Sequence, residues 1–236
     1  MKKVLILVLS ADVPPYDEMM QTSQNTWDSI NIEGCETLYY CDASEKPNTE
    51  KVIYVDTVYN LFTMGRKDLL AYEWILANKE FDYVARVNSS CYVNKKELIK
   101  YVQNLPEKDL FSGFTVPVEN GDPYMWGGLQ FVISRDVIQK MVDNKWNWNH
   151  KVMEDQAMSE LVRSLGIPFH EGKACSIDKQ LNDSWLLLAY GGGDNMVFAD
   201  FAELNKLDNH FFYRVKCDGQ RSVDKFVMEE MFKCLS

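Results

Sequence analysis

FDYVARVNSSCYVN, residues 81–94, places a short polar run directly after an apolar segment. The segment Asp82–Val87 is typical of a buried β-strand, and Lys95–Asn104, closed by Pro106, is typical of a helix. Asn88-Ser89-Ser90 lies between the two. A strand, a polar turn and a helix in this order indicate one unit of a sheet that is flanked by helices.

The same alternation continues in both directions along the chain. Strands are predicted at Lys3–Leu9, Glu36–Cys41, Lys51–Val55, Asp82–Val87, Leu110–Phe114 and Leu129–Ile133. Helices are predicted at Asp17–Ile30, Leu61–Asn78, Lys95–Asn104, Arg135–Asp143, Glu154–Leu165 and Ser222–Leu235, the last with Ser222 as its N-cap. This order predicts an α/β fold with a mostly parallel, Rossmann-like sheet. No internal repeat or long linker divides the chain, so we expect a single domain over residues 1–236.

The composition is that of an acidic, folded protein. The chain has 236 residues, 46% of them hydrophobic, and a formal net charge of −10. Such a surface repels phosphate, and no basic run offsets it, so general nucleic-acid binding is not expected. The apolar run Val4–Leu9 is too short to span a membrane, and we interpret it as a strand of a soluble, cytoplasmic protein. The six cysteines form no CxxC pair, which argues against a zinc site and favours buried thiols in a reducing compartment.

Polar residues follow three of the predicted strands. In open α/β sheets, ligands bind beyond the carboxyl ends of the strands. That rule selects Ser10-Ala11 after the first strand, Asp42 after the second, and Asn88, Ser89 and Ser90 after Asp82–Val87. We therefore predict that these residues share one ligand site.

A series of short motifs resembles one known family. The motifs are Thr26-Trp27, Asp56 with Tyr59-Asn60-Leu61 and Lys67, Trp74, Phe81–Asn94, Trp126–Arg135 (WGGLQFVISR), and Glu154-Asp155 with Leu165-Gly166-Ile167. Their order, over Val4–Ile167, resembles that of the β-1,3-galactosyltransferase and fringe-like glycosyltransferases, which have the GT-A fold. The resemblance implies an inverting transfer from a nucleotide sugar, above all a UDP-sugar, to a hydroxyl of a carbohydrate-type acceptor. It also implies a donor-nucleotide-binding half over residues 1–105 and an acceptor and catalytic half over residues 106–236.

Two positions depart from the family pattern. Gln24 stands where the family has an arginine in its first helix. Asn88-Ser89-Ser90 stands where the family has three aspartates, the last of which holds a divalent metal on the donor diphosphate. Mn²⁺ and Mg²⁺ prefer anionic oxygen ligands, so a site of neutral oxygens is expected to bind metal weakly. Ser90 and, as a late ligand, His210 remain candidates to hold a metal.

A basic segment near the C-terminus offers another way to neutralise a diphosphate. Residues 208–221 (DNHFFYRVKCDGQR) contain His210, Arg214, Lys216 and Arg221. Fixed cations bind phosphate without a metal. The alternative is that these residues form ordinary surface ion pairs. Gly191-Gly192-Gly193 lacks the context of a phosphate-binding loop and favours a flexible turn or a lid.

The catalytic candidates lie at the start of the helix at residues 154–165. The resemblance assigns the catalytic base to Asp155, and Glu154 is a candidate to bind acceptor hydroxyls; alternatively, both are acidic residues favoured by the helix dipole. Trp126, Gly127 and Gly128 are acceptor-site candidates, because an aromatic face stacks on sugars and glycine admits close approach. The alternative is a turn before a core strand with a packed tryptophan.

Two further cations are donor-site candidates. Lys67 lies in a predicted helix from which it can reach the donor, and Arg86 lies near the end of a predicted strand beside Asn88. Three functional hypotheses follow for the whole chain. The first is an active glycosyltransferase. The second is a GT-A-like module that binds a glycan or nucleotide without turnover. The third, a DNA-base-modifying glycosyltransferase, needs a basic groove that the composition does not indicate.

Overall fold

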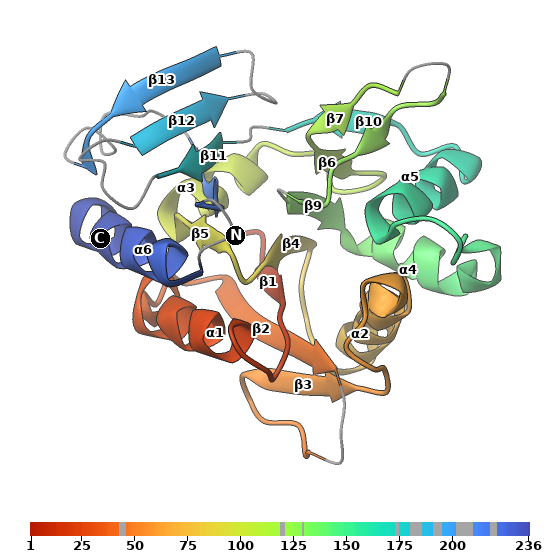
Figure 1. Ribbon diagram of the computed structural model, residues 1–236. Coiled ribbons are helices and arrows are strands. Elements are labelled where there is room, and N and C mark those ends of the chain that lie inside the picture. The colour runs from red at the N-terminus through yellow and green to blue at the C-terminus, as the bar shows by residue number, and fades with distance from the viewer. Residues whose placement is uncertain are drawn as a thin grey trace.

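A seven-stranded mixed sheet forms the centre of the molecule in the computed structural model (Figure 1). The structure describes residues 1–42, 46–118, 121–128, 130–172, 175–179, 186–190, 195–201, 210–217 and 221–236. The strand order is β10-β6-β9-β4-β1-β2-β3. The strands are β1 (Val4–Leu9), β2 (Cys35–Asp42), β3 (Val52–Val55), β4 (Tyr83–Asn88), β6 (Phe111–Gly113), β9 (Gln130–Ser134) and β10 (Phe169–Glu171). All neighbours are parallel except β9, which runs antiparallel to both β4 and β6.

Strand β1 shows why this sheet is buried on both faces. Its sequence, VLILVL, is wholly apolar, and successive side chains point to opposite faces. Ile6 and Val8 join the core on one face, and Leu5 and Leu7 join the core on the other. Hydrophobic burial on two faces therefore fixes β1 at the middle of the fold.

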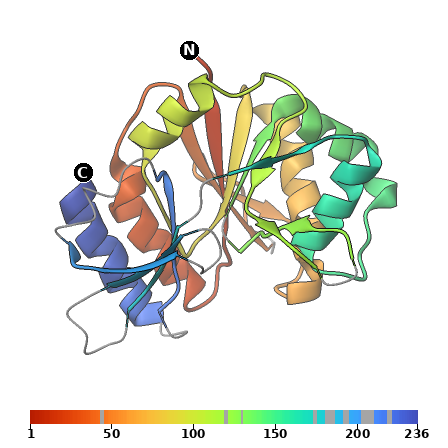
Figure 2. The same ribbon diagram turned by 90° about the horizontal axis from the view of Figure 1, so that it is seen from above.

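Helices cover each face of the sheet in two groups (Figure 2). Helices α1 (Tyr16–Asn25), α3 (Lys95–Gln103) and α6 (Arg221–Leu235) lie on the Ile6 face, and α6 packs against α1. Helices α2 (Met64–Asn78), α4 (Arg135–Asp143) and α5 (Glu154–Ser164) lie on the Leu5 face. The helix ranges and the early strands predicted from the sequence are thus largely confirmed.

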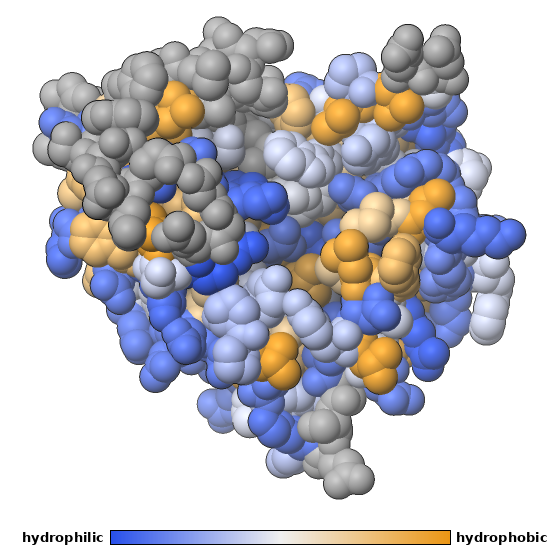
Figure 3. Space-filling model, viewed as in Figure 1, coloured by the Kyte–Doolittle hydropathy of each residue, from blue (hydrophilic) through white to orange (hydrophobic). Residues whose placement is uncertain are grey.

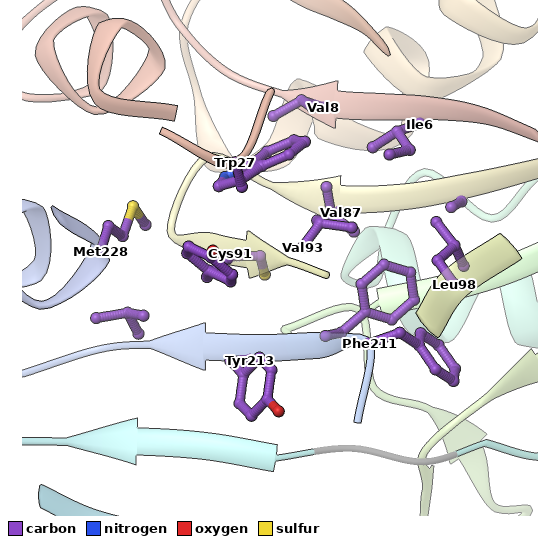
Figure 4. Packing of buried hydrophobic residues seen from close by; sticks show 14 of the residues in the cluster. Ile6, Val8, Trp27, Val87, Cys91, Val93, Leu98, Phe211, Tyr213 and Met228 are labelled. Atoms are coloured by element: carbon purple, nitrogen blue, oxygen red, sulfur yellow. The ribbon is translucent and has the colours of Figure 1, made fainter. Parts of the chain in front are cut away.

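A second sheet begins where β4 ends. After Asn88, the turn Ser89-Ser90 leads into β5 (Cys91–Val93), the edge of a five-stranded sheet in the order β13-β12-β11-β14-β5. Its other strands are β11 (Cys175–Asp178), β12 (Leu186–Tyr190), β13 (Asn195–Ala199) and β14 (Phe212–Val215). One core joins Val8 and Val87 of the large sheet to Cys91 of β5 and Met228 of α6 (Figure 4). The two sheets therefore belong to a single domain. A two-stranded ribbon pairs β7 (Thr115–Val116) with β8 (Tyr124–Met125).

Several predicted boundaries are wrong. The first helix ends at Asn25 and is followed by a 3₁₀ turn over Trp27–Ser29, and α2 begins only at Met64, after a 3₁₀ turn over Leu61–Thr63. Helix α6 begins at Arg221, so Ser222 lies inside its first turn and does not cap it. Residues 191–193, expected to form a turn or lid, lie outside the described residues.

The cysteines agree with the expectation that most of them are buried free thiols. No disulfide joins the six cysteines, and Cys41, Cys91, Cys175 and Cys217 are buried. Among the described residues, none of the helices combines the length and the apolar composition that a membrane span requires.

Candidate active site

A cavity of about 360 Å³ opens beyond the carboxyl ends of β1, β2 and β4. Figure 3 shows the face of Figure 1, which is hollowed near the middle between hydrophilic and hydrophobic residues. The cavity gathers these predicted site residues: Ser10, Ala11, Asp42, Lys67, Asn88, Ser89, Ser90, Trp126, Gly128, Glu154, Asp155 and Arg214. The residues at the strand ends and those from the motifs therefore line the same cavity.

Four predicted site residues do not line this cavity. Arg86 is fully buried and lies behind the wall with Gly127. His210 is half-buried, and its ring lies 6.2 Å from that of Tyr213. Lys216 is exposed and follows the last residue of β14; its backbone N–H donates to the Ile177 carbonyl. The basic segment thus delivers Arg214 and Arg221 to the cavity but not His210 or Lys216.

Asp42 and Lys67 form a nearly buried ion pair at one end of the cavity. Lys67 Nζ lies 2.8 Å from Asp42 Oδ2, and Thr57 Oγ1 donates to Asp42 Oδ1 at 3.0 Å. Lys67 also donates to the carbonyl of Ser10. Because its charge is already compensated, Lys67 is better suited to hold the wall in place than to bind a phosphate.

Arg86, buried behind the cavity wall, connects the residues at the end of β4 to helix α5. Its Nη1 donates to Asn88 Oδ1 at 3.0 Å and to the Gly127 carbonyl at 3.1 Å. Its Nη2 lies 3.4 Å from both Asp68 Oδ2 and Glu154 Oε1. One buried cation therefore orients both the Asn88 amide and the Glu154 carboxylate. The role predicted for Arg86, direct donor contact, is not supported by this position.

The two carboxylates at the start of α5 differ in their environment. Asp155 Oδ2 accepts from the Gly127 N–H at 3.1 Å, and Oδ1 accepts from the Gln156 N–H at 2.8 Å. A Cβ at position 127 would lie 2.9 Å from the Asp155 Cβ, so only glycine permits this approach. Glu154 Oε2 is buried without a hydrogen-bond partner in the described part of the chain, and burial raises the pKa of this carboxyl.

Arg214 lies against Trp126 on the opposite side. Strand β14 pairs with β5, which places Arg214 opposite Cys91, and the Val215 N–H donates to the Ser90 carbonyl at 2.8 Å. The guanidinium carbon lies 5.7 Å from the centre of the Trp126 ring. Its Nε and Nη1 are buried and find no hydrogen-bond partner among the residues that the structure describes. Burial lowers the pKa of this guanidinium.

The cavity also contains Arg221, which belongs to the basic segment at residues 208–221, and several residues that were not predicted as site residues. Arg221 Nη1 lies 2.6 Å from Asp224 Oδ2, and the Arg221 guanidinium lies 6.0 Å from the centre of the Tyr16 ring. The rings of Tyr16 and Tyr59 lie 5.8 Å apart, and their hydrogen bond raises the pKa of Tyr59 to about 12. The motif Tyr59-Asn60-Leu61 is a sequence signal for Tyr59, because it resembles the family pattern, but it does not indicate that Tyr59 contacts Tyr16. Other lining residues are Leu9, Asn60, Leu61, Met64 and Met153.

The residues at the end of β4 do not fit a divalent cation. Asn88, Ser89 and Ser90 supply only neutral oxygens, and Asn88 Oδ1 already accepts from the Arg86 guanidinium. A metal ion on that oxygen would lie beside a buried positive charge. Over the described residues, no three His, Cys, Asp or Glu side chains group into a metal site. Ser90 and His210 are the two expected metal ligands, but His210 does not line the cavity.

Comparison with known proteins places the fold but not a family. No protein-family model matches the sequence, and no curated protein matches it significantly. One similar solved structure is a glycosyltransferase involved in the glycosylation of the major capsid of PBCV-1. Its TM-score is 0.54 at 15% identity, over 96% of this chain and 98% of that one. A 4-diphosphocytidyl-2C-methyl-D-erythritol synthase from Anaerococcus prevotii DSM 20548 has a TM-score of 0.46 at 12% identity, over 72% and 86% of the chains. This chain has a glycosyltransferase-like fold of the GT-A type.

Proposed function

We propose that the protein transfers a sugar from a nucleotide sugar to a hydroxyl group of a carbohydrate-type acceptor. The observation that carries the proposal is the cavity itself. It combines a carboxylate pair, Glu154 and Asp155, with a buried guanidinium, Arg214, whose nitrogens lack partners. Glycosyl transfer needs a base for the attacking hydroxyl and a positive group for the leaving diphosphate. The likeness of the fold to a glycosyltransferase supports the same reading.

Asp155 is the proposed catalytic base. Two backbone N–H groups, from Gly127 and Gln156, hold its carboxylate at the cavity wall. Asp155 takes the proton of the acceptor hydroxyl while that oxygen bonds to the anomeric carbon of the donor. The bond from this carbon to the diphosphate oxygen breaks, and its electron pair leaves with the nucleoside diphosphate. A single displacement of this kind inverts the anomeric centre.

The other groups of the cavity position the two substrates. Glu154, held by Arg86, accepts a hydrogen bond from an acceptor hydroxyl through its Oε2. Trp126 offers its ring as a wall for a sugar. The nucleoside lies toward Ser10 and Asp42, at the ends of β1 and β2, where a carboxylate oxygen can accept from a ribose hydroxyl.

The test measures transfer or hydrolysis with a panel of nucleotide sugars, beginning with UDP-sugars. The release of nucleoside diphosphate is the readout. Asp155→Asn removes the base and should lower kcat by about 10²- to 10⁴-fold with little change in donor affinity. Asp143→Asn, at the far end of α4, is the matched control and should retain full activity. Absence of turnover with every donor, with and without Mn²⁺, would refute the proposal, as would an Asp155→Asn protein with wild-type kcat.

A second candidate is a GT-A-like module that binds a nucleotide or glycan without turnover. The neutral residues Asn88-Ser89-Ser90 favour it, because they stand where the resembled family has metal-binding aspartates. Calorimetry combined with a product assay separates the two candidates, because Asp155→Asn is expected to leave donor affinity nearly unchanged in both. A binding module would bind UDP or a glycan with no product formed.

A further inference from the structure

The strand-end residues leave the negative charge of a bound diphosphate without a metal partner. Asn88 Oδ1 accepts a hydrogen bond from Arg86 Nη1 at 3.0 Å, so this oxygen is already engaged and is poorly suited to bind a metal ion. Ser89 and Ser90 are neutral and nearly buried. A divalent ion prefers anionic oxygens, so this edge of the cavity favours an anion over a cation.

Among the described residues, three cations line the cavity, and two of them have close carboxylate partners. Lys67 is paired with Asp42 and Arg221 with Asp224. Arg214 has no carboxylate at ion-pair distance in the described part of the chain. Its buried Nε and Nη1 donors lack acceptors, which is costly unless a ligand supplies them. The observation therefore points to a ligand with several anionic oxygens.

Two contacts and the lack of a side chain at Gly128 fix the position of Arg214 before any ligand binds. Its strand is tied to the polar turn by the bond from the Val215 N–H to the Ser90 carbonyl. Its guanidinium lies over Trp126. Gly128 leaves the space open, since a Cβ there would lie 2.7 Å from Arg214 Nη1. A planar guanidinium fixed in this way presents two parallel donors to a phosphate group.

We propose that Arg214 binds the diphosphate of the donor directly and takes the place of a divalent cation. This inference rests on the proposed function, which supplies the diphosphate, and it makes donor binding independent of metal. His210 and Lys216 belong to the same stretch of sequence but do not reach the cavity, so they contribute nothing to the binding.

The test is calorimetric binding of UDP, with GDP in parallel, in EDTA and in Mn²⁺. We expect a nucleoside diphosphate to bind in EDTA with an affinity within about twofold of that in Mn²⁺. Arg214→Ala should weaken this binding by about tenfold or more, and Arg214→Lys, which keeps charge but loses the planar fork, should lie in between. Lys216→Ala is the matched control and should bind as the wild type does.

A second measurement separates phosphate contact from a general loss of structure. Arg214→Ala should weaken UDP more than UMP, because UMP lacks the second phosphate, and its far-UV spectrum and melting temperature should stay close to those of the wild type. If neither UDP nor GDP binds in EDTA, or if Arg214→Ala binds UDP as the wild type does, the inference is overturned. If UDP binds through Arg214 but no sugar is transferred, the proposed function fails and the inference stands.

Discussion

Arg86 shows how far a single residue can be understood from its position in a strand. Val84 and Leu7, its neighbours on the same face, belong to the core beneath α2 and α5. Period-two alternation therefore directs Arg86 into that core and away from the cavity. Proximity to Asn88 along the chain predicts donor contact, but it does not say which face of the strand a side chain takes. The structure instead shows a buried cation between Asp68 and Glu154.

Removal of this cation should strongly destabilise the protein. Arg86→Met keeps a long apolar side chain but leaves Asp68 and Glu154 buried without their partner. Breaking a buried pair from one side costs about 3–5 kcal/mol. Urea denaturation measures the loss. Lys100→Ala, which breaks an exposed pair with Glu97, should cost no more than about 1 kcal/mol. A similar, small loss in both variants would contradict this account.

Glu154 should make stability depend on pH. Burial raises the pKa of its carboxyl, partly offset by Arg86, so folding favours the protonated form. The stability from this group is fully present below the unfolded pKa of about 4.3 and is lost as pH rises through the folded pKa. The free energy of unfolding of the wild type, minus that of Glu154→Gln, should therefore fall as the pH rises from about 4 to about 8. Urea titrations at several pH values measure it; a flat or rising difference would show that Glu154 is not desolvated.

At the scale of elements, the sequence predicted the large sheet better than the small one. Strand β1 and helix α5 carry long apolar patterns, and such patterns are local. Strand β5 has only three residues, and its partner β14 lies more than a hundred positions later in the chain. Pairing of this kind leaves no local signal, so the placement of Arg214 beside the polar turn could be proposed only from charge clustering. The small sheet nevertheless contributes Arg214 to the cavity.

A substitution at Gly128 tests whether Trp126 and Arg214 must lie so close to the backbone at this position. A Cβ at Gly128 would lie 2.6 Å from Trp126 Nε1 and 2.7 Å from Arg214 Nη1, so at least one of these groups must move. We expect Gly128→Ala to weaken UDP binding by about tenfold, measured by calorimetry. In Gly121→Ala, a control in an exposed loop, the added methyl would meet only the Val118 side chain. Wild-type affinity in Gly128→Ala would mean that Arg214 does not need its observed position.

At the scale of the whole molecule, the two halves expected from the resemblance are interleaved. Residues 1–105 supply β4, whose neighbour β9 comes from residues 130–134. They also supply β5, which pairs with β14 near the C-terminus. Helix α6 returns to pack on α1, with an ion pair between Lys225 and Glu18. The boundary at residue 105 therefore does not separate two structural units.

This interleaving predicts that the chain unfolds as one unit. A fragment of residues 1–105 would lose β9, which pairs with β4, and β14, which pairs with β5. It would expose two strand edges together with the apolar side chains of Val87 and Tyr92. We expect the full chain to show one urea transition that coincides by far-UV circular dichroism and tryptophan fluorescence, and the fragment to show no cooperative transition. Tryptophans in both halves, Trp27 and Trp148, are buried and report on the two faces of the sheet. Two separate transitions, or a fragment that melts cooperatively, would mean that the donor half is an independent domain, and the cavity would then lie between two bodies free to move.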